Sequence, residues 1–255
     1  MKDPSEWRNK ALLLGIPLFA ALAVAAAFAC AHQGNRSCRQ ESSRIPQPSA
    51  NVAPSTAELV PEDPRAKEVV ERMRGFSIQY RNARSDGQPD PDQIRRDQIM
   101  AEFRQIGEGA VPAIDRALRD PDAQMRRNAA LALVELAGTW TGKPPVNTRS
   151  SIPSLIAAAD DPDSHVRGWS ALALAEIGPE AKQAVPTLIR LLKDPEEGPR
   201  NTSALALGGI GAAAEAAIPA LKEALDDPKK DVRRFAQGAI AQIEKACAQR
   251  DAETR

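Results

Sequence analysis

The chain has 255 residues, of which 42% are hydrophobic, 27% charged and only 4% aromatic. Lys plus Arg and Asp plus Glu are balanced at 34 each, so the charge gives no argument for a nucleic-acid partner or an anionic lipid surface. A chain so poor in aromatic residues builds its core from Ala, Leu, Ile and Val, which suits closely packed helices.

The N-terminal part of the chain contains an uncharged apolar run. A polar segment, residues 1–10, precedes residues 11–31, which are long enough to span a bilayer because a spanning helix needs about 20 apolar residues. We expect a transmembrane anchor here. The alternatives are a lipoprotein attached through Cys30 and a cleaved signal segment, since Ala27-Phe28-Ala29 has the small-x-small form of a cleavage site. A first hydrophobic segment usually directs the export of the chain that comes after it, so we expect the remaining residues outside the cytoplasm.

Residues 32–65 are polar and rich in proline and serine, with no helical or strand periodicity. This composition predicts a flexible linker between the apolar run and the rest of the chain.

Four copies of one pattern occupy residues 108–248. One proline of each copy lies in an Asp-Pro pair, and these prolines are Pro121, Pro162, Pro195 and Pro228, spaced by 41, 33 and 33 residues. A second proline, in the sequences AVPAI, SIPSL, AVPTL and AIPAL, recurs with the same three spacings. Periods of this size are typical of a solenoid of repeated supersecondary units.

Each copy predicts two helices joined by a short turn. In the third copy, Pro186 stands near a helix start, where a proline costs no hydrogen bond. Asp194-Pro195 ends this first helix, because the residue before a proline avoids the helical region. A second helix then runs to Gly211, the residue type best suited to a helix C-terminus.

The pattern extends weakly upstream. Residues 90–107 look like another second helix, with Ile94, Arg95 and Ile99 on its repeat positions, and residues 66–80 would be its partner. We expect a divergent N-terminal cap repeat, a repeat domain over residues 66–248, and a polar tail over residues 249–255.

The copies resemble HEAT-like repeats of the short bacterial kind found in phycocyanobilin lyases. The matching residues run from Val166-Arg167 to Ile177-Gly178 and from Val232-Arg233 to Ile243. The resemblance implies an all-α fold, an α/α superhelix of about five helix pairs with the second helices on the concave face. It also implies, as one function, a bilin-lyase-like accessory protein or enzyme of cofactor attachment.

The sequence offers no constellation for catalysis or metal binding. It has two histidines, His32 and His165, and neither belongs to the paired His-Glu motif of the HEAT-like metal-dependent hydroxylases. The glycines from Gly208 to Gly211 lie at a predicted helix C-terminus, whereas a phosphate site needs a helix N-terminus. We therefore expect no catalytic residue, no metal and no cofactor.

Aspartate and arginine recur in register through the four copies. The aspartates are Asp120, Asp161, Asp194 and Asp227, and the arginines are Arg126, Arg167, Arg200 and Arg233. Because a specific ligand site rarely needs four copies, we interpret them as turn hydrogen bonds and inter-repeat ion pairs that set the stacking.

A second row of residues departs from the repeat pattern. Leu131, Leu172 and Leu205 share a position that the resemblance marks as usually polar, on the face of the second helices. We hypothesise an apolar groove for a partner's helix or peptide. The flanking charged residues are Arg127, Glu135, Glu176 and Arg234. The alternative is that the leucines pack between repeats.

An insertion between Gly138 and Ile152 lengthens one period by eight residues. Insertions in solenoids map to loops on one edge, often a binding edge, so Trp140 is a candidate contact residue. An inert surface excursion is the alternative. Together these features predict a non-catalytic, membrane-tethered scaffold that binds a protein partner through its concave helix face.

Overall fold

The computed structural model describes residues 60–75, 91–138 and 144–254, and every regular element within them is helical. The predicted apolar run 11–31, Cys30, most of the predicted linker and Trp140 lie outside these residues.

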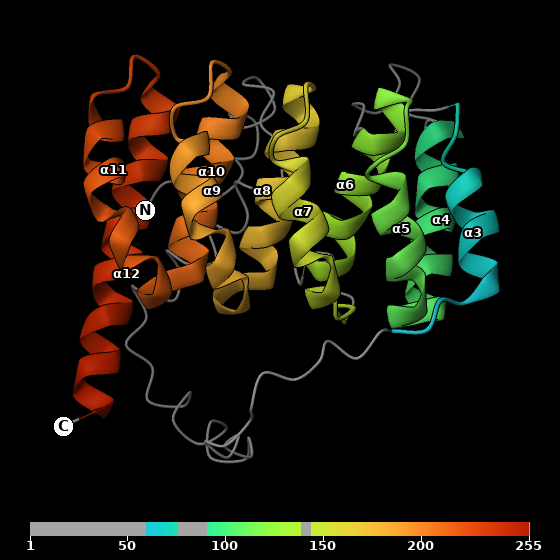
Figure 1. Cartoon of the computed structure of the whole chain (residues 1–255), viewed down its shortest axis with the longest axis horizontal. Coiled ribbons are helices and arrows are strands. Elements are labelled where there is room, and N and C mark those ends of the chain that lie inside the picture. The colour runs from blue at the N-terminus through green and yellow to red at the C-terminus, as the bar shows by residue number, and fades with distance from the viewer. Residues whose placement is uncertain (1–59, 76–90, 139–143, 255) are drawn as a thin grey trace, which may run out of the picture. The chain divides into compact units, whose positions relative to one another are not determined.

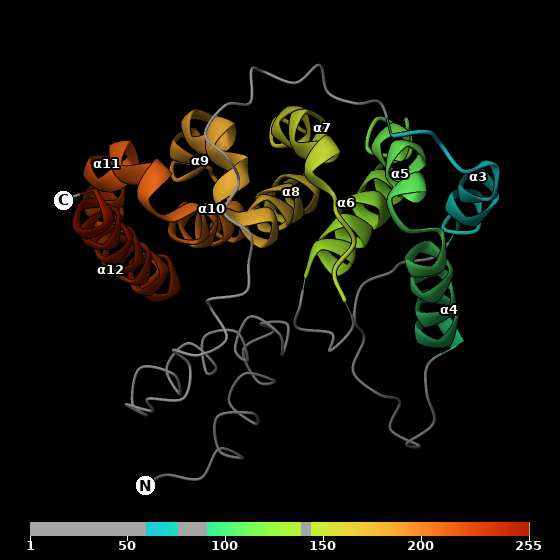
Figure 2. The ribbon, with the colours of Figure 1, turned by 90° about the horizontal axis from the view of Figure 1, so that it is seen from below.

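The described chain is a stack of helix pairs. The first helices are α5 (Val111–Ala117), α7 (Ile152–Ala158), α9 (Val185–Leu191) and α11 (Ile218–Glu223). The second helices are α6 (Ala123–Ala137), α8 (Ser164–Ile177), α10 (Glu197–Ile210) and α12 (Lys230–Glu253). First helices form one layer and second helices a parallel one, as Figures 1 and 2 show. The prediction of an all-α repeat solenoid is confirmed.

Local sequence explains where the helices begin and end. Each first helix carries a proline in its first turn, where the missing N–H removes no helical hydrogen bond. At the second helices, Asp122 accepts a hydrogen bond from Gln124 N–H, and Asp163 accepts from His165 N–H, as N-caps do. Gly178 and Gly211 end α8 and α10 with φ of 74° and 70°, a backbone region that favours glycine.

Short 3-10 turns connect one repeat to the next. They are η3 (Gly107–Ala110), η4 (Arg149–Ser151), η5 (Gly178–Ala184) and η6 (Gly211–Ala217), and η7 (Ala224–Asp226) follows α11. Within the described residues, the stretch Glu197–Asp226 has the length and hydropathy of a membrane span. However, Gly211 and η6 divide it into α10 and α11, which both contribute fully buried leucines to the core, Leu207 and Leu221. The stretch is therefore the second helix of one repeat and the first helix of the next.

Small residues let neighbouring second helices approach closely. Within the second-helix layer, α6 packs on α8, α8 on α10, and α10 on α12. A Cβ atom on Gly208 of α10 would lie 3.1 Å from Ala239 Cα of α12, and one on Gly209 would lie 3.1 Å from the Ala175 carbonyl oxygen of α8. The glycine pair near the end of α10 is thus explained by helix packing.

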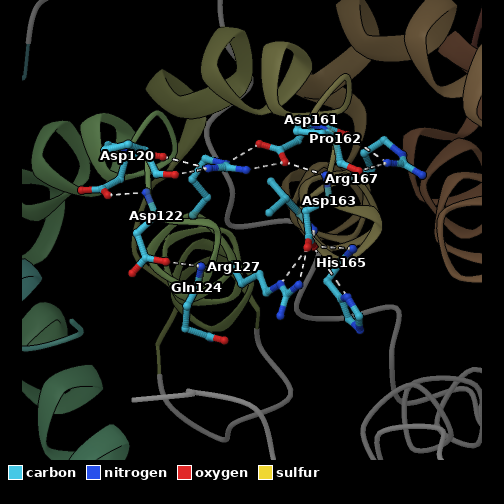
Figure 3. Close-up of polar contacts among 12 residues, drawn as sticks. Asp120, Asp122, Gln124, Arg127, Asp161, Pro162, Asp163, His165 and Arg167 are labelled. Atoms are coloured by element: carbon cyan, nitrogen blue, oxygen red, sulfur yellow. Dashed lines mark hydrogen bonds and ion pairs between the residues drawn. The ribbon is translucent and has the colours of Figure 1, made fainter. Parts of the chain in front are cut away.

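The repeated arginines and aspartates join successive repeats. Nη1 of Arg167 donates to the carbonyls of Asp161 and Pro162 in its own turn, and its Nε donates to Asp194 of the next repeat. Equivalent inter-repeat pairs with Nε–Oδ2 distances of 2.6, 2.7 and 2.8 Å are Arg126–Asp161, Arg167–Asp194 and Arg200–Asp227. Figure 3 shows the part of this series between α6 and α8. The prediction of turn hydrogen bonds and inter-repeat pairs is confirmed.

The N-terminal repeat departs from this geometry. It consists of α3 (Pro64–Glu71) and α4 (Pro91–Ile106). We call Arg126, Arg167 and Arg200, with their aspartate partners, the ladder. Arg74, just after α3, takes the place of a ladder arginine and pairs with Asp120, with 2.8 Å between Nη2 and Oδ2. The expectation that Ile94 and Arg95 follow the repeat pattern was wrong, since both are exposed and Arg96 is buried instead. Ile99 and Phe103, further along α4, are fully buried as the repeat pattern predicts.

The last helix is longer than the others. It continues through Glu253, beyond residue 248 where the repeat pattern ends. Arg250 pairs there with Glu215 of η6, with 3.1 Å between Nη2 and Oε2. This extension lies over the turn that connects α10 to α11.

Candidate partner-binding surface

A row of partly buried apolar side chains lies on the second helices. We call Trp169, Leu172, Leu205 and Phe235 the apolar stripe; each of these side chains is only partly buried. Trp169 and Leu172 are three residues apart on α8, so they are neighbours on one helix face. Leu205 lies on α10 and Phe235 on α12, the next two helices of the layer. The stripe therefore runs across three repeats.

Charged or titratable groups accompany the two aromatic side chains. The His165 and Trp169 rings lie with their centroids 5.6 Å apart, and the Arg234 guanidinium carbon lies 5.0 Å from the centre of the Phe235 ring. Arg234 is exposed and also lies 3.3 Å from Asp231. The aromatic rings are thus held by contacts within their own helices.

The first member of the predicted leucine row lies elsewhere. Leu131 is 7% exposed, and Glu135 on the same helix is 4% exposed. α4 packs against α6, and Arg96 Nε of α4 lies 3.7 Å from Glu135 Oε1. The structure therefore places Leu131 and Glu135 under the cap repeat, while Leu172 and Leu205 reach the surface.

Arg127 is engaged within the solenoid. Its guanidinium reaches from α6 to Asp163 at the start of α8, with 3.0 Å between Nε and Oδ2, as Figure 3 shows. This hydrogen bond holds the pKa of Asp163 below its usual range. Arg127 thus adds a second ion pair at the boundary that Arg126 and Asp161 already join.

Glu176 has a different environment from the other acidic residues of this face. It is half-buried near the end of α8, and this burial raises the pKa of its carboxyl group. No ion pair joins it to a cation among the described residues. In the sequence, Glu176 is a flanking charge like Glu135, and no local signal marks the difference in their environments.

The described part of the insertion folds back on the solenoid. The Val146 N–H donates to the Leu136 carbonyl at 2.8 Å, and Val146 packs against the core. A cleft of about 440 Å³ lies between it and the end of α4. Its lining residues are Arg104, Gln105, Gly107, Glu108, Pro144, Pro145, Val146 and Asn147. This cleft was not expected from the sequence, and Trp140 lies outside the described residues.

No group of three potential metal-ligating side chains occurs within residues 60–75, 91–138 and 144–254. His165 is exposed, and its Nδ1 lies 3.6 Å from Asp163 Oδ1 at the helix start.

Comparisons with known protein families agree with the repeat architecture. Residues 152–241 match a family model described as HEAT repeats, and residues 96–194 match one described as non-SMC mitotic condensation complex subunit 1. No curated protein matches the sequence.

Several solved structures have folds similar to that of this chain. The complex of CpcE and CpcF of phycocyanin lyase from Nostoc sp. PCC7120 is similar at 26% identity and a TM-score of 0.50, over 78% of this chain and 71% of that one. An engineered protein is similar at 21% identity and a TM-score of 0.49, over 71% and 80% of the two chains. A designed armadillo repeat protein in complex with the peptide (KR)4 is similar at 20% identity and a TM-score of 0.46, over 74% and 90%. Together with the helix pairs and the family match, the likeness to the lyase complex identifies the described region as a solenoid of HEAT-like repeats.

Proposed function

We propose that this chain is a non-catalytic scaffold that binds a protein partner on the face formed by its second helices. The observation that carries the proposal is the apolar stripe, four large apolar side chains left partly exposed on three adjacent helices. Contiguous exposed apolar surface marks interaction sites, and large aromatic side chains supply much of the binding energy in such interfaces.

The repeats themselves provide an internal comparison. Leu131, Leu172 and Leu205 occupy one repeat position, and the leucine is buried where α4 covers it. Leu172 and Leu205 stay partly exposed at the same repeat position. A partner segment bound on α8 and α10 would bury these two leucines, as Leu131 is buried in α6. An amphipathic helix or an extended peptide has the required shape.

We place this scaffold on a membrane. Residues 11–31 would anchor the chain with the repeats outside the cytoplasm, and the proline-rich residues 32–65 would be the flexible tether between them. The alternatives remain lipid attachment at Cys30 and secretion.

Site-specific photocrosslinking tests the binding face. A photoreactive benzophenone side chain is introduced at Leu205, and the matched control carries it at Lys222, which is exposed on α11 in the other layer. Irradiation of the native membrane fraction should give a discrete adduct from residue 205 and none from residue 222. If both positions give the same products, or if residue 205 gives no adduct, the second-helix face is not the binding surface.

The likeness to the phycocyanin lyase complex favours a second candidate, an accessory role in bilin attachment. Co-expression with a bilin tests it directly. Bilin absorbance that co-purifies with the chain would support this role, and its absence under conditions in which a lyase control binds would reject it.

A further inference from the structure

Glu176 lies next to the apolar stripe. It follows Leu172 by four residues on α8, so the two side chains are neighbours on one helix face. It is also the second-last residue of that helix. The C-terminal end of a helix carries the negative end of the helix dipole, which disfavours a carboxylate. Both the position and the half-burial of Glu176 therefore destabilise its negative charge.

Several acidic residues in the turns before the second helices are matched by cations. Asp163 pairs with Arg127, and Asp161, Asp194 and Asp227 pair with the ladder arginines. Glu135 occupies in α6 the position of Glu176 in α8, and Arg96 of the cap repeat lies 3.7 Å from it. Thus, in the repeat where Leu131 and Glu135 are buried, the neighbouring helix α4 supplies a cation, Arg96.

The surface beside Glu176 is open on the side of α10. Gly209 holds the equivalent position there and is exposed. A Cβ atom on Gly209 would lie 3.1 Å from the Ala175 carbonyl oxygen, so tight packing keeps this position free of a side chain. A long cationic side chain from a partner could lie over Gly209 and reach the Glu176 carboxylate.

We propose that the protein segment that covers the apolar stripe carries a Lys or Arg between apolar residues, and that this cation pairs with Glu176. The inference rests on the proposed function and adds the chemistry of the partner. Its basis is charge complementarity: a half-buried carboxylate without a cation among the described residues, at a position where the covered repeat has Arg96. Pairing in a partly desolvated site gives specificity more than affinity.

Selection of random peptides displayed on phage tests this chemistry. The full chain, solubilised in detergent, is the target, and selected peptides are remeasured on three variants. Leu172→Glu with Leu205→Glu removes the apolar stripe, Glu176→Lys reverses the charge, and Glu244→Gln removes an exposed carboxylate of α12 as the matched control. Circular dichroism checks that each variant is folded. If Glu176→Lys does not fold, Glu176→Gln is used in its place.

We expect selected peptides with a basic residue flanked by apolar ones. Their affinity should fall about tenfold on Glu176→Lys and stay unchanged on Glu244→Gln. A peptide whose basic residue is replaced by Glu should regain affinity on Glu176→Lys.

Two results would contradict the account at different levels. Peptides that need the leucines but bind wild type and Glu176→Lys equally would overturn the cation inference and leave the proposed function intact. If no selected peptide depends on Leu172 and Leu205, or if none is selected, the proposed binding face and the inference fail together.

Discussion

Arg167 and Asp194 form a bidentate ion pair across the boundary between two repeats. Nε and Nη2 of the arginine lie 2.7 Å and 2.9 Å from the two carboxylate oxygens, and Nη1 donates to two carbonyls of the turn before α8. The planar guanidinium thus ties its own turn to the next one, which a lysine cannot do in the same way.

Arg167→Lys should lower the free energy of unfolding by about 2 kcal/mol, because it leaves the nearly buried Asp194 poorly paired. Arg233→Lys is the matched control. Arg233 makes the same turn hydrogen bonds, at 2.6 Å and 3.1 Å, but no carboxylate of a following repeat faces it among the described residues. Urea denaturation followed by circular dichroism measures both. If both variants lose the same free energy of unfolding, the Arg167–Asp194 ion pair adds no stability to that of the turn hydrogen bonds.

Close packing between α10 and α12 makes Gly208 sensitive to a single methyl group. Gly208→Ala should lower the free energy of unfolding by about 1–3 kcal/mol, because the new Cβ would lie 3.1 Å from Ala239 Cα. Gly238→Ala, at an exposed helix position with no atom within 4 Å of the new Cβ, should raise it by about 0.5–1 kcal/mol. Thermal unfolding of the two variants should therefore shift in opposite directions. A neutral Gly208→Ala would contradict the packing described here.

The aspartates of the ladder should make the solenoid sensitive to acid. Arg74 holds the pKa of Asp120 below its usual range, and the pKa of Asp194 is also lowered despite its burial, because Arg167 binds it. The unfolded chain then binds more protons, so stability is present above about pH 4 and falls as pH drops through the folded pKa values. Melting temperatures measured from neutral pH downward should show this loss, and Asp194→Asn should make the curve flatter. If the slope of melting temperature against pH is unchanged in Asp194→Asn, Asp194 does not contribute to the acid sensitivity.

The contribution of Glu176 to stability should depend on pH in the opposite direction. Burial raises the pKa of its carboxyl group in the folded chain, so the folded state binds more protons than the unfolded state between the two pKa values. Stability from this group therefore falls as pH rises through that window, and Glu176→Gln should raise the melting temperature at pH 7. The difference from wild type should vanish below about pH 4, where the unfolded carboxyl is also protonated. A lower melting temperature for Glu176→Gln at neutral pH would reveal a stabilising partner.

Much of the fold can be predicted from the sequence, because the same helix-boundary residues recur in every repeat. Prolines fix the helix starts, glycines such as Gly211 fix the ends, and the register of Arg167 with Asp194 indicates the inter-repeat pair. The cap repeat is different, since the same pattern in residues 90–107 gives no sign that Arg74 replaces the ladder arginine. A residue outside the periodic pattern cannot be found by periodicity.

The candidate surface was predicted only in part. Leu131, Leu172 and Leu205 are equivalent in the sequence, and what separates them is the packing of α4 over α6. Exposure at a repeat position depends on the neighbour in space, which local sequence does not specify. For the same reason, the sequence does not show that Glu135 lies near a cation and that, within the described part of the chain, Glu176 does not. This difference is seen only in the structure.

Binding of a protein partner to the apolar stripe can be tested with one double variant and one control. Leu172→Glu with Leu205→Glu changes two partly exposed side chains, whereas the control Leu131→Glu places a charge in the core and should unfold the chain. The measurement is the affinity of the full chain for the protein crosslinked through residue 205, with helicity checked by circular dichroism. We expect the double variant to keep its helicity and to bind that protein more than about tenfold more weakly. A folded double variant that binds as tightly as wild type would contradict it, and so would a double variant that unfolds as Leu131→Glu does.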